Sequence, residues 1–176
     1  YDKLKLISSH GRMDQTSYFN NPNQSDYVGL GYNWRMSSLA AGLGISQLNK
    51  LDKIIKMRQK NALFLSNRLS KIPELTVPEP PPGFDHIYQM YTIRLKNKTI
   101  RDLLHEYLTK KRIFSKIYFS PIHLTKFYQN KYDLSKTLLP ITEKISNEIL
   151  TIPLYPNMTN EEKSYLVESI EEFFEN

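Results

Sequence analysis

The strongest constraint on the fold of this chain is a long helical pattern of apolar residues between positions 36 and 72. Apolar side chains recur there at steps of three or four residues, as on one face of an α-helix: Met36, Leu39, Ala40, Leu43, Leu48, Leu51, Ile54, Ile55, Ala62, Leu65, Leu69 and Ile72. Ser37 is a plausible N-cap and Pro73 a stop signal. A helix of this span is roughly 50 Å long. It is longer than a small domain, so we expect it to join two bodies.

Two glycines interrupt this pattern, Gly42 and Gly44. Each costs a helix about 1 kcal/mol relative to alanine. They predict a bend in the helix or a close approach by another backbone. Before the helix, residues 13–31 are polar and lack periodicity, so we expect a long loop of functional importance.

After Pro73 the sequence predicts a small α+β unit. The expected strands are 75–77, 86–95, 113–119 and 151–155, with a loop over 120–132. Thr99 is expected to cap one helix, Pro140 to lie in the first turn of a second, and Thr159 with Glu162 to form a capping box for the last. Together these elements are interpreted as a small α+β unit with a mainly antiparallel sheet, following the long helix.

Composition and charge exclude several classes of protein. The chain has 176 residues, with no Cys, which excludes a disulfide scaffold, a thiolate nucleophile and a Cys-ligated metal. This suits a cytoplasmic protein. No apolar run reaches the roughly 18–20 residues of a membrane helix, so we expect no membrane partner. The net charge of +6 is most simply explained by lysines and arginines on solvated helix faces, and it would also suit an anionic partner, such as a small phosphorylated ligand. A nucleic-acid surface is the alternative, but a recognition motif for it is missing.

The segment Gly31–Ser37 (GYNWRMS) stands where the polar loop meets the long helix. Free N–H groups at a helix start, together with Asn33 and Arg35, are suited to an anion or phosphate. The alternative is an ordinary capped helix with a buried Trp34. His10 and His123 lie in predicted loops and could contact a substrate, or they could be ordinary surface or packed histidines. The four His show no metal-ligand spacing, so we expect no metal site.

Several segments, taken in order, resemble the C-terminal half of the PLP-dependent sugar aminotransferases of the DegT/DnrJ/EryC1/StrS family. The matching stretches are 9–12 (SHGR), 31–37 (GYNWRMS), 40–41, 47–52 (QLNKLD) with Arg58, Tyr118, 121–124 (PIHL), Pro140 with Glu143, 152–156 (IPLYP) and 158–162 (MTNEE). Their order and spacing carry the resemblance, which covers nearly the whole chain.

The resemblance implies an α/β protein of the PLP transferase fold type I, working as a homodimer. In this chain it implies three parts. They are the end of the large domain with an active-site loop (1–34), a long interdomain helix (35–72) and a small C-terminal α+β domain (73–176). The implied reaction transfers an amino group from glutamate or glutamine to a nucleotide-linked keto-sugar, in cell-surface polysaccharide or amino-sugar biosynthesis.

The resemblance also implies roles for six residues. Asn33 would reach the PLP phosphate of the neighbouring subunit, with Arg35 close to it. His10, Tyr32, Tyr118 and His123 would lie near the substrate. Two positions depart from the family pattern: Trp34 replaces the usual Tyr or Phe, and Ile113 stands where Gly is frequent.

The family's Schiff-base lysine is expected upstream of Tyr1, in a catalytic N-terminal half that precedes this chain. We therefore expect no catalytic residue within 1–176, and no transamination by these residues alone. Two alternatives remain. One is a family member with dehydratase chemistry, in which His replaces that lysine. The other is a non-catalytic basic binding module, which would bind nucleic acid with a steep dependence on salt.

Overall fold

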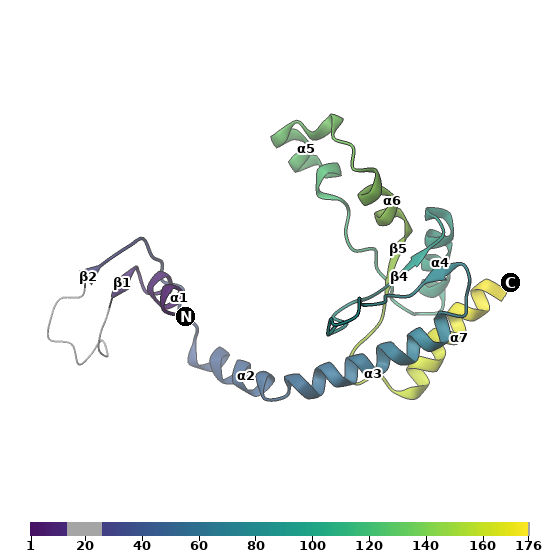
Figure 1. Ribbon diagram of the computed structural model, residues 1–176, viewed down its shortest axis with the longest axis horizontal. Helices are drawn as coiled ribbons and strands as arrows, with labels where there is room; N and C mark the ends of the chain where they lie inside the picture. The colour runs from purple at the N-terminus through teal and green to yellow at the C-terminus, as the bar shows by residue number, and fades with distance from the viewer. Residues whose placement is uncertain (14–25, 176) are drawn as a thin grey trace. The chain divides into compact units, whose positions relative to one another are not determined.

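The computed structural model describes residues 1–13 and 26–175. Most of the polar loop predicted over 13–31 lies outside these described residues. The chain divides into two compact units, Tyr1–Lys50 and Leu51–Asn176, which are described separately below (Figure 1).

The first unit begins with helix α1 (Asp2–Ser8). Two short strands, β1 (Arg12–Met13) and β2 (Asp26–Tyr27), pair antiparallel with Arg12 opposite Tyr27. Helix α2 (Ser38–Leu48) ends the unit. The Ser37 hydroxyl accepts a hydrogen bond from the Ala40 N–H at 3.2 Å, as expected of an N-cap.

The single helix predicted over 35–72 is divided in the structure. Helix α2 ends at Leu48 and helix α3 (Leu51–Leu69) begins three residues later. At the break, the Lys50 N–H donates to the Gln47 carbonyl at 3.0 Å, a tighter bond than the α-helical pattern, which closes α2 in a 3₁₀-type turn. The break is not at the glycines. A Cβ built on Gly42 or Gly44 meets no other described atom within 4 Å, so no described segment approaches them closely.

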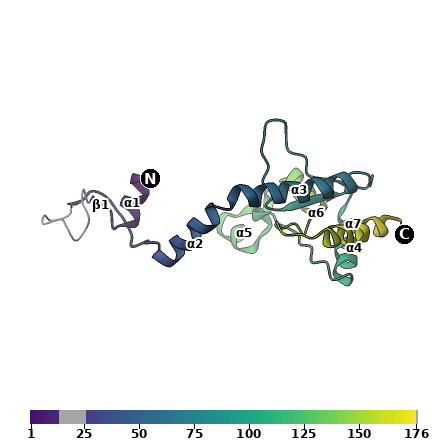
Figure 2. The same cartoon turned by 90° about the horizontal axis from the view of Figure 1, so that it is seen from below.

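The second unit contains an antiparallel sheet, as the sequence predicts, but with three strands, in the order β3-β4-β5, in place of the four expected. The strands are β3 (Leu75–Thr76), β4 (Tyr91–Leu95) and β5 (Ile149–Ile152), with Tyr91 opposite Ile152. The remaining elements are α4 (Lys98–Lys110), the 3₁₀ turns η2 (Ile122–Leu124) and η3 (Leu134–Lys136), α5 (Lys126–Tyr132), α6 (Pro140–Glu148) and α7 (Asn160–Glu175). Helices α3 and α7 pack side by side (Figure 2).

The core of the second unit lies between the sheet and its helices. Side chains with no solvent exposure come from α3, β4, α4, β5 and α7: Leu65, Leu69, Tyr91, Ile93, Leu104, Leu108, Leu150, Val167 and Ile170. The C-terminal part of the apolar pattern found in the sequence is therefore the buried face of α3. The N-terminal part of the pattern, in α2, is exposed to solvent: α2 has no buried residue, and Leu39 is 87% exposed.

Two predicted strands are shorter or shifted, because side chains from α3 use the backbone carbonyls that a strand would need. Arg58 donates to the carbonyls of Tyr88, Gln89 and Leu154, at 2.9, 3.2 and 3.3 Å. Asn61 donates to the carbonyls at 155 and 156, at 2.8 and 3.1 Å. The strand predicted over 86–95 therefore begins at Tyr91. The strand predicted over 151–155 is observed as β5, which begins and ends earlier, at Ile149 and Ile152.

The segment predicted as a strand over 113–119 makes only one bridge to the sheet, between Lys116 and Thr151. The loop predicted over 120–132 contains η2 and α5. Asn97, and not Thr99, caps α4, since its side chain accepts from the Ile100 N–H at 3.0 Å. Pro140 begins α6 as predicted.

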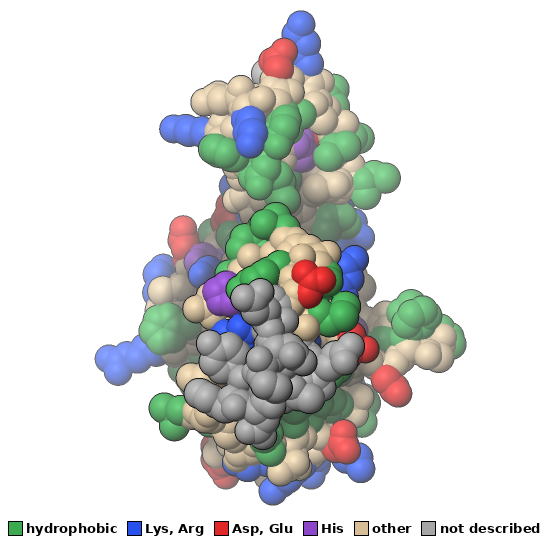
Figure 3. Space-filling model, turned by 90° about the vertical axis from the view of Figure 1, so that its left-hand side faces the viewer, with side chains coloured by type: hydrophobic (Ala, Val, Ile, Leu, Met, Phe, Trp, Pro, Cys, Tyr) green, Lys and Arg blue, Asp and Glu red, His purple; other side chains and the backbone are tan. Residues whose placement is uncertain are grey.

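The capping box of α7 is confirmed. The Thr159 N–H donates to Glu162 Oε2 at 2.8 Å, and the Glu162 N–H donates to Thr159 Oγ1 at 3.1 Å. Apolar side chains remain exposed around α5 and the start of α6, including Phe127, Leu138 and Ile141. Hydrophobic atoms show at this end of the molecule in the space-filling view (Figure 3). Among the described residues, no helix has the length and apolar character to cross a membrane.

Candidate functional site

In the first unit, the end of α1 pairs with the GYNWRMS segment. The Tyr32 N–H donates to the Ile7 carbonyl at 2.6 Å, and the His10 N–H donates to the Tyr32 carbonyl at 2.9 Å. Ser9 and Asn33 form an antiparallel bridge. Three predicted site residues, His10, Tyr32 and Asn33, therefore lie on two adjoining backbone segments.

The aromatic side chains of this segment stack on each other. The rings of Tyr32 and Trp34 have centroids 4.2 Å apart and are inclined by 6°. Trp34 is 65% exposed, so the alternative that it is buried is wrong, although the predicted cap of the following helix is present. The stacked pair presents a flat apolar surface next to Asn33.

Asn33 and Arg35 are both exposed, a few residues before the Ser37 cap of α2. Their side chains have no hydrogen-bond partner or ion pair among residues 1–13 and 26–175. An amide and a guanidinium are hydrogen-bond donors, and the guanidinium carries a permanent positive charge. This set of donors fits a phosphate group chemically.

Tyr118, in the second unit, lines a cavity of about 230 Å³ at the end of β4 and β5. The lining residues are Gln89, Met90, Tyr91, Phe114, Lys116, Tyr118, Thr151, Ile152, Pro153 and Leu154. Lys116 holds its Nζ atom 5.1 Å from the centroid of the Tyr118 ring, a cation–π arrangement. It is the one charged side chain in this lining, so the cavity favours an anion.

His123 lies in η2 and is only 6% exposed. Its Nε2 atom is 2.9 Å from Oε1 of Glu143 on α6. The same carboxylate oxygen accepts a hydrogen bond from the Leu139 N–H at 3.0 Å. Hydrogen bonds from His123 and then from the Leu139 N–H lower the pKa of the Glu143 carboxyl below its ordinary value. His123 is therefore a buried histidine whose ring is bonded to Glu143, and it is not a free surface histidine.

The six predicted residues fall into two groups. His10, Tyr32, Asn33 and Arg35 belong to the first unit, and Tyr118 and His123 to the second. Glu143 and Lys116, which contact His123 and Tyr118, have no role predicted from the sequence. Glu143 appeared in the matched pattern and Lys116 stands two residues from Tyr118. Both residues could therefore have been noticed in the sequence. Spacing alone, however, does not show that Glu143 contacts His123, which is 20 positions away.

The described residues contain no group of three or more His, Asp or Glu side chains that could hold a metal ion.

Comparison with known proteins gives a consistent result. GDP-perosamine synthase of Escherichia coli O157:H7 is 28% identical over 82% of this chain and 38% of its own length. The structure of PseC of Helicobacter pylori, an aminotransferase involved in the biosynthesis of pseudoaminic acid, matches with a TM-score of 0.84 at 23% identity. The match covers 99% of this chain and 46% of PseC.

The PLP form of the sugar aminotransferase Spr1654 of Streptococcus pneumoniae matches with a TM-score of 0.77 at 20% identity, over 99% of this chain and 43% of that protein. The predicted fold class is thus confirmed by solved sugar aminotransferases. The chain spans less than half the length of these relatives. The model of the DegT/DnrJ/EryC1/StrS aminotransferase family matches residues 1–171, and the chain therefore belongs to that family.

Proposed function

We propose that this chain is the C-terminal portion of a PLP-dependent aminotransferase that moves an amino group from glutamate or glutamine to a nucleotide-linked keto-sugar. The observation that carries the proposal is the family match over residues 1–171, which includes the exposed, unpaired donors Asn33 and Arg35 before α2. The product would serve cell-surface polysaccharide or amino-sugar biosynthesis in the cytoplasm. GDP-perosamine synthase and PseC, whose names point to sugar products, support this substrate class.

Asn33 and Arg35 would hold the phosphate of PLP. Their side chains offer an amide donor and a fork of guanidinium donors, and the N-terminal end of α2, an 11-residue helix, adds a favourable dipole. PLP, when bound, supplies the carbon that carries the amino group between the donor and the sugar. In a homodimer Asn33 would serve the site of the neighbouring subunit, and the Schiff-base lysine would come from the N-terminal half of the enzyme.

His10, Tyr32, Tyr118 and His123 would contact the sugar nucleotide. The cavity beside Tyr118 suits this ligand, because Lys116 is its only charged lining residue and a diphosphate is strongly anionic. The stacked rings of Tyr32 and Trp34 offer a flat face to a planar or apolar part of the ligand.

The rest of the enzyme would cover the exposed apolar side chains of α2. Leu43, Ile45 and Leu48 are 64%, 61% and 66% exposed in this chain. Exposed aliphatic side chains along a whole helix are typical of a surface that packs against another part of a protein. The large domain or the second subunit of the dimer would supply that part.

The test is an amination assay with the complete enzyme, using GDP- and UDP-linked keto-sugars and either amino donor. Mass spectrometry should find a product in which CH–NH₂ replaces C=O. A product that has lost water and gained no nitrogen would support the dehydratase alternative. Absence of any reaction, together with salt-sensitive binding of nucleic acid, would support the basic binding module.

The cofactor assignment is tested by Asn33→Ala. Loss of one hydrogen bond to a charged phosphate should weaken PLP retention by about 1.5–3 kcal/mol, roughly ten- to a hundredfold. Asn67→Ala, an exposed Asn on α3, is the matched control and should retain PLP normally. Equal PLP affinity in both variants would contradict the assignment of Asn33.

A further inference from the structure

We propose that Glu143 is a positioning residue that fixes the ring of His123, so that Nδ1 is the nitrogen presented to the substrate. The inference deepens the proposed function and rests on it for the contact between His123 and the sugar. The buried imidazole of His123 lies against a carboxylate that is itself held by its helix.

The first step is the orientation of the His123 ring. Nε2 lies 2.9 Å from Oε1 of Glu143, within hydrogen-bonding distance, and the residue is 6% exposed, so the surroundings hold the ring in place. An ionised carboxylate only accepts hydrogen bonds. Nε2 must then carry the proton that it donates to Glu143.

The second step is that Glu143 is in turn fixed. Its Oε1 also accepts from the Leu139 N–H at 3.0 Å, which ties the side chain to the first turn of α6. Both bonds favour the charged form of the carboxyl, in agreement with its lowered pKa. Glu143 therefore acts as a charged acceptor in a set position.

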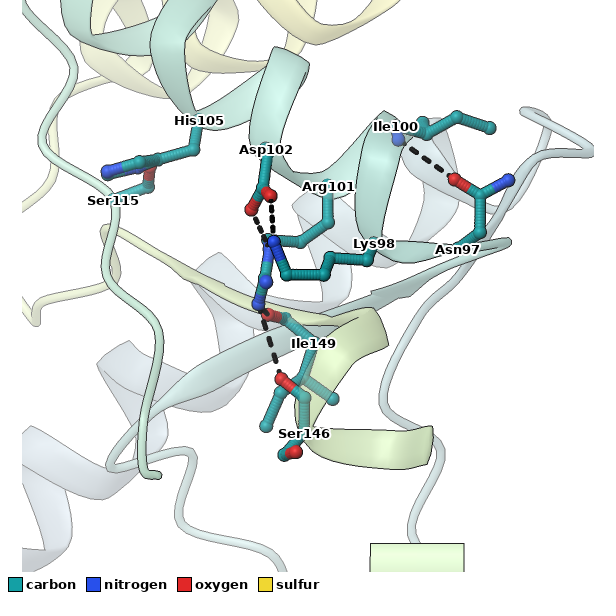
Figure 4. Close-up of polar contacts among 9 residues, drawn as sticks. All are labelled: Asn97, Lys98, Ile100, Arg101, Asp102, His105, Ser115, Ser146 and Ile149. Carbon is teal, nitrogen blue, oxygen red and sulfur yellow. Dashed lines mark hydrogen bonds and ion pairs between the residues drawn. The ribbon is translucent and has the colours of Figure 1, made fainter. Parts of the chain in front are cut away.

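The third step is that α6 is anchored at its other end. Arg101 of α4 is 4% exposed and extends toward the last carbonyls of α6, with Nη1 3.2 Å from the Ser146 oxygen and 3.5 Å from the Ile149 oxygen (Figure 4). Arg94 of β4 pairs with Glu148 at 2.7 Å. A cation at the C-terminal end of a helix is also favourable to its dipole. The helix is thus a firm support for Glu143.

The fourth step concerns the free nitrogen. Nδ1 of His123 has no hydrogen-bond partner among the described residues. Within that part of the chain, only Tyr107 Oη is a buried side-chain polar atom without a partner, so Nδ1 keeps access to solvent. In the neutral ring, a protonated Nε2 leaves Nδ1 with a lone pair. That lone pair accepts a hydrogen bond, which suits a hydroxyl group of the sugar.

The decisive measurement is nuclear magnetic resonance of the intact protein with ¹⁵N-labelled histidine, at a pH where the ring is neutral. Four His are present, and His123→Gln identifies the signals of His123. We expect the wild-type ring to carry its proton on Nε2. Glu143→Gln should lower the population of the Nε2–H tautomer, because the amide oxygen that keeps the bond from Leu139 also faces Nε2 and, being neutral, accepts more weakly than a carboxylate.

The matched control is Glu171→Gln. Glu171 forms an ion pair with Arg68 at 2.6 Å on other helices, so its loss should leave the tautomer of His123 unchanged. A wild-type ring protonated on Nδ1 would overturn the proposal, even if Glu143→Gln failed to fold. An unchanged tautomer in a folded Glu143→Gln protein would overturn it as well.

Kinetics test the part that concerns the substrate. The amide of Asn can occupy the place of Nδ1, and the amide of Gln the place of Nε2. His123→Asn should therefore keep the KM for the sugar nucleotide within a few-fold of wild type, whereas His123→Gln should raise it about tenfold or more. The reverse order, or no change in either variant, would overturn the assignment of Nδ1. Failure of amination altogether would count against the proposed function, while the tautomer still decides the role of Glu143.

Discussion

Gly11 and Gly31 meet backbone to backbone, with no room for a side chain at either position. A Cβ atom built on Gly31 would lie 1.8 Å from the amide nitrogen of Gly11, and one built on Gly11 would lie 1.8 Å from the carbonyl oxygen of Gly29. Gly11 also has a φ of +72°, which disfavours any other residue. This contact brings Tyr32 and Asn33 against the end of α1.

Gly31→Ala is therefore expected to open the pairing between residues 7–10 and 32–34. A methyl group cannot be placed without moving the backbone of Gly11, so local stability should fall by about 1–3 kcal/mol. Hydrogen exchange measures this directly. The amides of Tyr32 and Trp34, which donate to Ile7 and Ser8, should lose roughly tenfold or more of their protection.

Gly42→Ala is the matched control, because a Cβ at Gly42 has no described atom within 4 Å. Alanine in a helix interior should stabilise α2 by up to about 1 kcal/mol. The exchange of Tyr32 and Trp34 should be unaffected. Equal loss of protection in the two variants would contradict the role given to the Gly11–Gly31 contact.

Local signals in the sequence were sufficient for several elements. The capping box of Thr159 and Glu162, the position of Pro140 and the buried face of α3 depend on neighbours a few residues away, which spacing reveals. The interruption after Leu48 depends on one 3₁₀-type hydrogen bond and has no clear sequence signal. The strand over 86–95 was predicted too long because its first half gives two carbonyls to Arg58, 30 residues or more away.

The same reason limits prediction of the site. Family resemblance selected His123 and Tyr118, but the partner of His123 comes from the tertiary fold. Glu143 reaches His123 only because α6 returns to η2. Lys116, in contrast, is a local partner that stands two residues before Tyr118, in a segment joined to β5 by a bridge to Thr151.

Arg58→Met should destabilise the second unit and loosen the cavity beside Tyr118. The substitution keeps much of the aliphatic stem but leaves the carbonyls of Tyr88, Gln89 and Leu154 without their donor, which costs about 1–3 kcal/mol. The midpoint of urea unfolding should fall with an unchanged slope.

Lys60→Met on the same helix is the control for Arg58, since Lys60 is exposed. Its unfolding midpoint should stay near that of wild type. In the complete enzyme, Arg58→Met should also raise the KM for the sugar nucleotide, because Gln89 and Leu154 line the cavity. A midpoint identical in both variants would refute the structural role of Arg58.

Asn97→Ala and Thr99→Ala distinguish the observed cap of α4 from the predicted one. Asn97 accepts the Ile100 N–H at 3.0 Å, so its replacement should lower the free energy of unfolding by about 1 kcal/mol. Thr99 lies inside the helix and is exposed, so Thr99→Ala should be neutral or slightly stabilising. Thermal unfolding of both variants decides the matter, and a larger loss at Thr99 would contradict the observed cap.

Tyr91 makes the stability of the second unit sensitive to alkaline pH. Its side chain is fully buried and its Oη atom is 2.7 Å from Ser66 Oγ. Burial is the main cause that raises the pKa of Tyr91 from 10.0 to about 12, so the fold favours the neutral phenol. The corresponding stability is complete below pH 10, the ordinary value, and is lost as the pH rises toward 12.

Unfolding measured between these pH values should therefore show a decline in wild type that is reduced in Tyr91→Phe. Tyrosinate absorbance provides a second measurement: Tyr91→Phe should remove amplitude from the last part of the titration of the twelve tyrosines. Loss of early amplitude in Tyr91→Phe would contradict the raised pKa of Tyr91, whose main cause is burial of the side chain.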